Sequence, residues 1–111
     1  MSEHEILIQR AYELAIAAVE NGNHPFGALL ASGPTRQDIV IESMNTVHTN
    51  NDVTRHAEME LLRKASKQLG AEKMAELTLY TSTEPCAMCT GAIYWSTVSR
   101  VVFGCSAALL G

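Results

Sequence analysis

The chain has 111 residues, of which 47% are hydrophobic and 18% charged, a composition typical of one globular domain rather than of a disordered segment. Its formal net charge of −4 lacks the basic excess of sequence-independent nucleic-acid binders, although one flipped or unpaired base could still be read in a pocket. No stretch approaches the ~20 apolar residues of a membrane span, and the first residues lack a secretory pattern, so we expect one cytoplasmic domain, residues 1–111, without a membrane.

The first half of the chain predicts a helix, a hairpin and a second helix. Residues 5–20 repeat apolar side chains at helical spacing. Two short apolar runs, 26–31 and 39–44, are separated by a Gly/Pro turn and predict two antiparallel strands. A polar loop then leads to a helix over residues 55–69, which Gly70 ends.

The second half predicts alternating strands and helices. Residues 77–82 are rich in β-branched and aromatic side chains, Pro85 opens a helix that runs to about residue 96, and residues 100–103 form a fourth strand closed by Gly104. This order predicts an α/β fold with a mixed sheet, in which an antiparallel hairpin is followed by parallel strands. Residues 106–111 are similar to the start of another helix.

Two short motifs bring together residues that bind metals. His56 stands at the start of the second predicted helix, and Cys86 and Cys89 stand at the start of the third. Because each helix follows a strand or loop, both N-termini can meet above the ends of the strands. One imidazole and two thiolates suit zinc, and three protein ligands leave a position for water, as in catalytic sites. A structural zinc site is the alternative, but it would need a fourth ligand.

Glu58 supplies the group that a metal site needs for proton transfer. In the first turn of a helix its carboxylate can lean past the helix end, take a proton from water and return it to a substrate without binding the metal. The pattern H-x-E followed by P-C-x-x-C is the signature of zinc nucleobase deaminases. An odd number of cysteines, three, also favours metal chemistry over a disulfide framework.

With these motifs the chain resembles the cytidine-deaminase-like superfamily, and most of all its branch of guanine deaminases and tRNA adenosine deaminases. The resemblance runs through the segments PFGA, HAEME, LYTSTEPCAMCTGAIYW and RVVFG. It implies a three-layer α/β/α fold, zinc (Zn²⁺) held by His56, Cys86 and Cys89, and Glu58 as the proton shuttle. Family members continue past the fourth strand with a helix and a further strand, so this C-terminal part is expected to be missing here.

The resemblance also implies a reaction, the hydrolytic deamination of an amino-substituted purine base or nucleoside. Guanine is the first choice because the run GAIYW and the acidic net charge are more typical of guanine deaminases. A tRNA adenosine deaminase and a cytosine or cytidine deaminase are the alternatives, so a tRNA partner stays open. A non-catalytic, zinc-stabilised deaminase-like module is the alternative from another class.

Substrate contacts are implied by the same resemblance. Asn45 matches a position whose carboxamide hydrogen-bonds the base, and the backbone amides of Ala57 and Cys86 match donors to the substrate. Phe26 and Pro85 stand in segments that lie beside the substrate in the family. For Asn45 the alternative is a structural role, the capping of a turn at the strand end.

Several other residues have two interpretations. His24 and His48 stand in polar loops, where they are either solvated or at the pocket mouth. Tyr94 and Trp95 could stack on a base, although a role in the core or in a subunit contact is the favoured interpretation. Cys105 is expected to be a small buried hydrophobe.

Two patterns in the sequence bear on the partners of the chain. A cluster of basic residues is expected to form a solvated helix face rather than an RNA contact, with Glu60 paired to Lys64. Its members are Arg63, Lys64, Lys67 and Lys73. A homodimer is expected because the fourth strand leaves an unpaired edge and the apolar surface around Ile93 and Trp95 needs covering.

Overall fold

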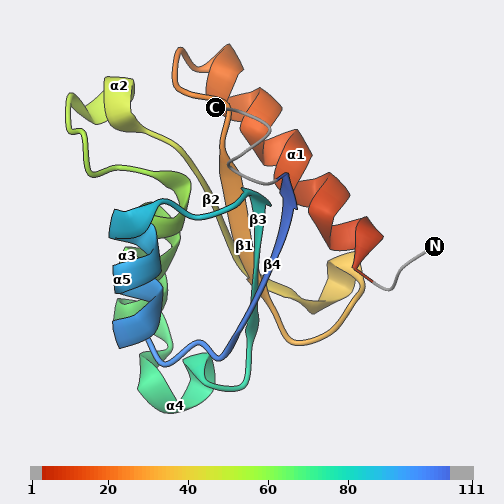
Figure 1. The fold of residues 1–111 in the computed structure, drawn as a ribbon. Helices are drawn as coiled ribbons and strands as arrows, with labels where there is room; N and C mark the ends of the chain where they lie inside the picture. The colour runs from red at the N-terminus through yellow and green to blue at the C-terminus, as the bar shows by residue number, and fades with distance from the viewer. Residues whose placement is uncertain (1–3, 106–111) are drawn as a thin grey trace.

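The computed structural model describes residues 4–105, and Figure 1 shows a sheet between two layers of helices. The sheet has four strands in the order β2-β1-β3-β4. They are β1 (Gly27–Ala31), β2 (Ile39–Met44), β3 (Thr78–Thr83) and β4 (Arg100–Cys105). Helix α1 (Glu5–Glu20) lies on one face, and α3 (Ala57–Gln68) and α5 (Ala87–Trp95) lie on the other. The predicted three-layer α/β/α fold is confirmed; the helix expected over residues 106–111 lies outside the described residues.

The sheet is mixed, as predicted. Strand β1 runs antiparallel to both β2 and β3, and β3 runs parallel to β4. Gly27 pairs with Met44, and Ala28 pairs with Thr81. The beginning of β1 and the ends of β2 and β3 therefore lie at one end of the sheet, where the chain enters the predicted site segments.

The core is divided by the sheet into two apolar clusters. Along β1, Ala28 and Leu30 join the cluster beneath α3, whereas Leu29 and Ala31 join the cluster beneath α1. Strand β1 is buried on both faces, because successive side chains of a strand point to opposite sides. This central position explains why its sequence, GALLA, is apolar throughout instead of alternating.

The structure moves several predicted boundaries. Helix α3 begins at Ala57 rather than at residue 55, α5 begins at Ala87 rather than at Pro85, and β4 passes through Gly104. Strand β4 continues because Cys105 still pairs with Thr83 of β3. Three short helices in segments expected to be loops or turns were missed. They are η1 (Arg36–Asp38), α2 (Val47–Asn50) and α4 (Gly70–Met74).

Helix α1 packs very closely on the start of β1, at Gly27. A Cβ atom added to Gly27 would lie 2.5 Å from the carbonyl oxygen of Ala11 and 2.5 Å from the Cβ of Leu14. Such distances leave no room for a side chain. The helix backbone can approach the strand only because residue 27 is glycine.

We therefore expect Gly27→Ala to lower the free energy of unfolding by about 1–3 kcal/mol, since overpacking forces α1 and β1 apart. Urea unfolding followed by circular dichroism measures the change. The control is Gly91→Ala in α5, where an added Cβ meets no atom within 4 Å and alanine favours the helix. Equal stability of Gly27→Ala and the wild type would contradict the close packing.

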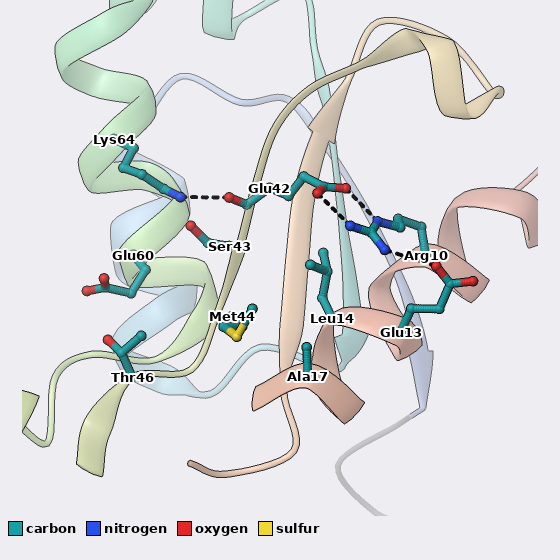
Figure 2. A pocket seen from close by; sticks show the side chains of 10 residues that line it. All are labelled: Arg10, Glu13, Leu14, Ala17, Glu42, Ser43, Met44, Thr46, Glu60 and Lys64. Carbon is teal, nitrogen blue, oxygen red and sulfur yellow. Dashed lines mark hydrogen bonds and ion pairs between the residues drawn. The ribbon is translucent and has the colours of Figure 1, made fainter. Parts of the chain in front are cut away.

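Edge strand β2 is contacted by both helical layers. In Figure 2, Lys64 of α3 reaches the strand from one side and Arg10 of α1 from the other. The Lys64 ammonium donates a 2.7 Å hydrogen bond to the backbone carbonyl of Glu42, and Arg10 donates two bonds of 2.6 and 2.7 Å to the Glu42 carboxylate. The predicted pair of Glu60 and Lys64 is thus wrong, because Lys64 turns to the strand edge.

No helix in the described part of the chain combines the length and apolarity needed to cross a membrane.

Candidate functional site

Two helix N-termini carry the predicted metal ligands. His56 is the N-cap residue of α3 and Cys86 is the N-cap residue of α5, and both have an extended backbone, with ψ of 158° and 176°. Cys89 follows on the first turn of α5, on the same side as Cys86. The chain enters α5 directly from the end of β3, so this helix start stands above the end of the sheet.

The three side chains converge on one point. The sulfur atoms of Cys86 and Cys89 lie 3.5 and 3.7 Å from Nδ1 of His56, and all three potential ligand atoms lie within 4.8 Å of one another. Tetrahedral zinc, with bonds of about 2.3 Å to sulfur and about 2.0–2.1 Å to nitrogen, places sulfur and nitrogen about 3.6 Å apart. The cluster therefore fits a zinc ion, and among the described residues no other group of this kind occurs.

The electrostatics of the cluster also suit a cation. Burial raises the pKa of the Cys89 thiol, and the nearby Glu58 carboxylate and Cys86 raise this pKa further. A divalent cation reverses that effect, because it stabilises the thiolate that binds it. Two sulfurs beside a carboxylate are thus an arrangement that a metal ion would stabilise.

Glu58 lies beside the cluster without belonging to it. It stands in the first turn of α3, and only 6% of its surface is exposed. Burial raises the pKa of its carboxyl group, while hydrogen bonds from its own amide and from the Thr81 side chain lower this pKa in part. A buried carboxyl of this kind is suited to proton transfer.

Thr81 was not singled out from the sequence. It lies on β3, pairs with Ala28 and is 1% exposed. Its neighbour Leu79 packs in the cluster beneath α3, so the period of two along the strand turns Thr81 to the same face. That alternation was the available signal for a β3 side chain that faces Glu58.

The predicted substrate residues stand around the same end of the sheet. Asn45 directly follows β2 and is 1% exposed, and its side-chain oxygen accepts a 3.0 Å hydrogen bond from the amide of Val47. The turn-capping contact is therefore present. No acceptor for the Asn45 side-chain nitrogen is found within the described chain, so this donor stays available to a ligand.

The other predicted substrate residues differ in how far they are buried. Phe26 is half-buried against the apolar cluster beneath α3, and its carbonyl accepts a 3.0 Å bond from the amide of Asn45. Pro85 is half-buried next to Cys86. The Ala57 side chain is fully buried in the core, so only its backbone can face a ligand.

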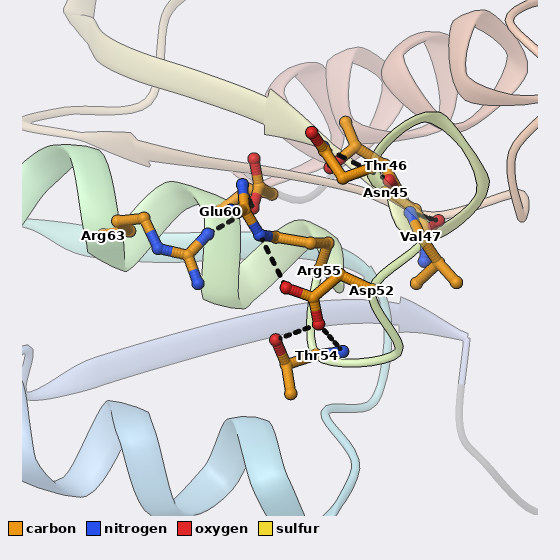
Figure 3. A network of polar contacts seen from close by, with 9 residues as sticks. Asn45, Thr46, Val47, Asp52, Thr54, Arg55, Glu60 and Arg63 are labelled. Atoms are coloured by element: carbon orange, nitrogen blue, oxygen red, sulfur yellow. Dashed lines mark hydrogen bonds and ion pairs between the residues drawn. The ribbon is translucent and has the colours of Figure 1, made fainter.

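A network of polar contacts, shown in Figure 3, holds the segment between Asn45 and His56. The Thr46 amide donates a 3.0 Å hydrogen bond to the Arg55 carbonyl, which closes the loop at its base. The Arg55 guanidinium lies 3.2 Å from Asp52 within the loop and 3.2 Å from Glu60 on α3. Arg55 thus ties the loop to the helix that begins at His56.

We expect Arg55→Met to release zinc about tenfold faster than the wild type, because groups that orient metal ligands affect metal affinity by about this factor or more. Transfer of zinc to a chromogenic chelator measures the rate. The matched control is Arg63→Met, which also removes a partner of Glu60 but does not touch the loop. Unchanged zinc release in Arg55→Met would show that the loop holds its shape without this contact.

The remaining residues singled out from the sequence lie away from the cluster or at the surface. His24 and His48 are both exposed and lie against each other. Tyr94 and Trp95 are 77% and 81% exposed, so a core role is wrong for both, whereas Ile93 is buried. The side chain of Cys105 lies outside the described residues.

The members of the basic group face solvent or nearby acceptors. Arg63 pairs with Glu60, and Lys73 lies 3.9 Å from Glu76. Lys67 is exposed. Three of the four basic residues lie on α3 and Lys73 lies on α4, and the expectation of a solvated face rather than an RNA contact stays a prediction.

A three-layer α/β/α fold with one histidine and two cysteines at paired helix N-termini, beside a buried glutamate, defines a zinc-binding domain of the deaminase type. The family described as "Cytidine and deoxycytidylate deaminase zinc-binding region" matches residues 1–105. The chain belongs to this family, and the resemblance stated from the sequence is confirmed.

Curated relatives include enzymes with different substrates. The chain is 45% identical over 101 residues to guanine deaminase of Bacillus subtilis, covering 90% of this chain and 63% of that protein. It is 36% identical over 104 residues to tRNA-specific adenosine deaminase of the same organism, covering 94% of this chain and 63% of the relative. The chain thus spans about two thirds or less of the length of these relatives.

The crystal structure of guanine deaminase from Bacillus subtilis superposes on the fold with a TM-score of 0.84 and 43% identity. This match covers 100% of the present chain and 71% of that structure. A structure from studies of A-to-I editing by tRNA:A34 deaminases superposes with a TM-score of 0.82 and 33% identity, covering 95% and 78% of the two chains.

Proposed function

We propose that this chain is a zinc-dependent hydrolytic deaminase, a single domain that converts the amino group of a nucleobase or nucleoside to an oxo group with release of ammonia. The observation that carries the proposal is the buried Glu58 beside the converging ligands His56, Cys86 and Cys89. The three ligands would hold zinc, which when bound supplies Lewis-acid activation of water.

Glu58 performs the proton transfers in this proposal. Its carboxylate accepts a proton from the attacking water and passes it to a ring nitrogen, as oxygen bonds to the carbon that carries the amine. Glu58 then carries the second proton of the water to the leaving nitrogen. The carbon–nitrogen bond breaks and ammonia departs, so water is consumed and no redox partner is needed.

The neighbouring residues would bind and orient the base. The side-chain nitrogen of Asn45 is a donor without a protein acceptor in the described region, and it would hydrogen-bond an acceptor of the base. The amides of Ala57 and Cys86 stand at the N-termini of α3 and α5, where helix dipoles favour developing negative charge. Phe26 and Pro85 would line the site with partly exposed apolar surface.

Guanine is our first choice of substrate. The run GAIYW, residues 91–95, and the net charge of −4 support it, as does the guanine deaminase among the relatives. Adenosine in tRNA is the second candidate, because tRNA-specific adenosine deaminases are also relatives and share the fold. Cytosine is the third, on the 38% identity to the probable cytosine deaminase of Schizosaccharomyces pombe.

Ammonia release from a panel of substrates tests the proposal on the zinc-loaded protein. The panel contains guanine, guanosine, adenosine, cytosine, cytidine and a tRNA anticodon stem-loop. We expect guanine to give the highest kcat/KM. Faster turnover of another member would identify that compound, and not guanine, as the preferred substrate. Bound zinc with no deamination of any member would favour a non-catalytic zinc module.

We further propose that two copies associate through the end of α5. Tyr94 and Trp95 present adjacent aromatic rings to solvent, with centroids 5.2 Å apart. Exposed aromatic pairs of this size are typical of interfaces. We expect a dimer in sedimentation equilibrium and a monomer for Trp95→Glu; a monomeric wild type would contradict the proposal.

We also propose a cytoplasmic location. Cys86 and Cys89 are not joined in a disulfide, and a reducing compartment would keep the pair available for zinc, whereas an oxidising one would favour a disulfide. Fractionation of cells that express the full-length protein tests this; recovery mainly from an oxidising compartment would contradict it.

A further inference from the structure

Two histidines outside the zinc cluster lie against each other. His24 belongs to the turn between α1 and β1, and His48 belongs to α2. Their ring centroids are 4.7 Å apart and the ring planes are inclined by 47°. Both residues are exposed, so a dissolved ion has access to the rings.

The backbone beneath both histidines is held in place by Asn23, which is 7% exposed. Its side-chain oxygen accepts hydrogen bonds of 2.9 and 3.0 Å from the amides of His48 and Thr49, and its nitrogen donates a 2.8 Å bond to the Thr49 hydroxyl. Because His24 directly follows Asn23, one buried side chain fixes the two histidine backbones relative to each other. Such preorganisation lowers the entropy cost of binding a ligand between them.

The spacing of the rings suits a shared metal ion. Metal–nitrogen bonds of about 2.0–2.1 Å at angles of roughly 90–110° place the centroids of two imidazoles about 4.5–5.2 Å apart. The observed 4.7 Å falls within that range. Neither ring makes a hydrogen bond to another residue of the described chain, so each can turn a nitrogen toward the ion.

We propose that His24 and His48 form a second, solvent-exposed site for a divalent transition-metal ion such as zinc, with water completing the coordination. Imidazole is a preferred ligand of zinc, copper and nickel, whereas calcium and magnesium prefer oxygen. This site is distinct from the cluster at His56, since it lies on different elements and contains no sulfur.

Occupation of the second site would tie two segments together. His24 precedes Phe26 by two residues, and His48 follows Asn45 by three, so an ion between the histidines would restrain both segments. In the terms of the proposed function, on which this step rests, the restrained segments are the ones that carry the substrate residues Asn45 and Phe26.

Calorimetric titration of zinc chloride into protein that already carries one equivalent of zinc tests the site. We expect one further, weaker equivalent in the wild type, at least about tenfold weaker binding in His24→Ala and in His48→Ala, and none in the double variant. His4→Gln is the control, because His4 contacts Tyr80 and not this pair. No second equivalent in the wild type, or an unchanged one in the double variant, would overturn the proposal.

Hydrogen exchange gives a second measurement without substrate. The amides of residues 47–50 should exchange more slowly after the second equivalent binds, in the wild type but not in the double variant; equal exchange would overturn the restraint. A chain that deaminates none of the panel would refute the proposed function, while the calorimetry would still decide the second site.

Discussion

The Glu58→Gln variant is expected to retain its zinc and to lose deamination by a factor of about 100 to 10,000. Glutamine keeps the shape and hydrogen-bonding capacity of the side chain, but it cannot accept a proton from water or return one to the leaving amine. Zinc stays bound because Glu58 is not among the three converging ligands. Steady-state ammonia release, together with zinc content by mass spectrometry, separates these two properties.

The control for this variant is Glu72→Gln, which alters a carboxylate in the first turn of α4, on an element that carries none of the site residues. It should match the wild type in both zinc content and turnover. Turnover of Glu58→Gln within a few-fold of the wild type would remove Glu58 from the mechanism. Loss of zinc from Glu58→Gln would instead indicate that the carboxylate is a metal ligand.

Replacement of a zinc ligand should have the second large effect. Cys89→Ala is expected to lose zinc and activity together, because two protein ligands hold the ion far less firmly than three. It should also lower the melting temperature, since bound zinc would connect the start of α3 to the start of α5. Ligand linkage gives the folded state about 2.7 kcal/mol when free zinc is 100-fold above its dissociation constant.

Calorimetry with and without added zinc measures this stabilisation, and a chelator should lower the melting temperature of the wild type to that of Cys89→Ala with zinc. Cys105→Ala is the control for cysteine chemistry, because the predicted ligand set does not include Cys105. A Cys89→Ala variant that binds zinc as tightly as the wild type would contradict the ligand set.

The chemistry of the site could be predicted from the sequence because its residues stand in two short motifs at helix starts. The spacing of Cys86 and Cys89 places both on one helix face, and the strand before them sets the helix start at the end of the sheet. The convergence of His56 with these cysteines agrees with that prediction. Helix α1 could be predicted with its ends because its apolar period is long and Gly22 follows it.

Features that depend on contacts between distant segments could not be predicted. Helix α2 is stabilised by Asn23, which lies more than twenty residues before it. The side-chain oxygen of Asn23 accepts hydrogen bonds from the amides of His48 and Thr49. The starts of α3 and α5 were each predicted two residues too early, because His56 and Cys86 have extended backbones that cap the helices and do not belong to them. Arg55 was also predicted to be helical, so its contact with Asp52 in the preceding loop was not expected.

The lysine that contacts edge strand β2 also limits how the molecule can assemble. A strand edge with free carbonyls and amides can recruit another extended chain and grow into an aggregate. The Lys64 ammonium occupies the Glu42 carbonyl and adds a hydrated charge in the path of an incoming strand. Growth of the sheet past β2 is therefore disfavoured, which helps to keep the protein dispersed at high concentration.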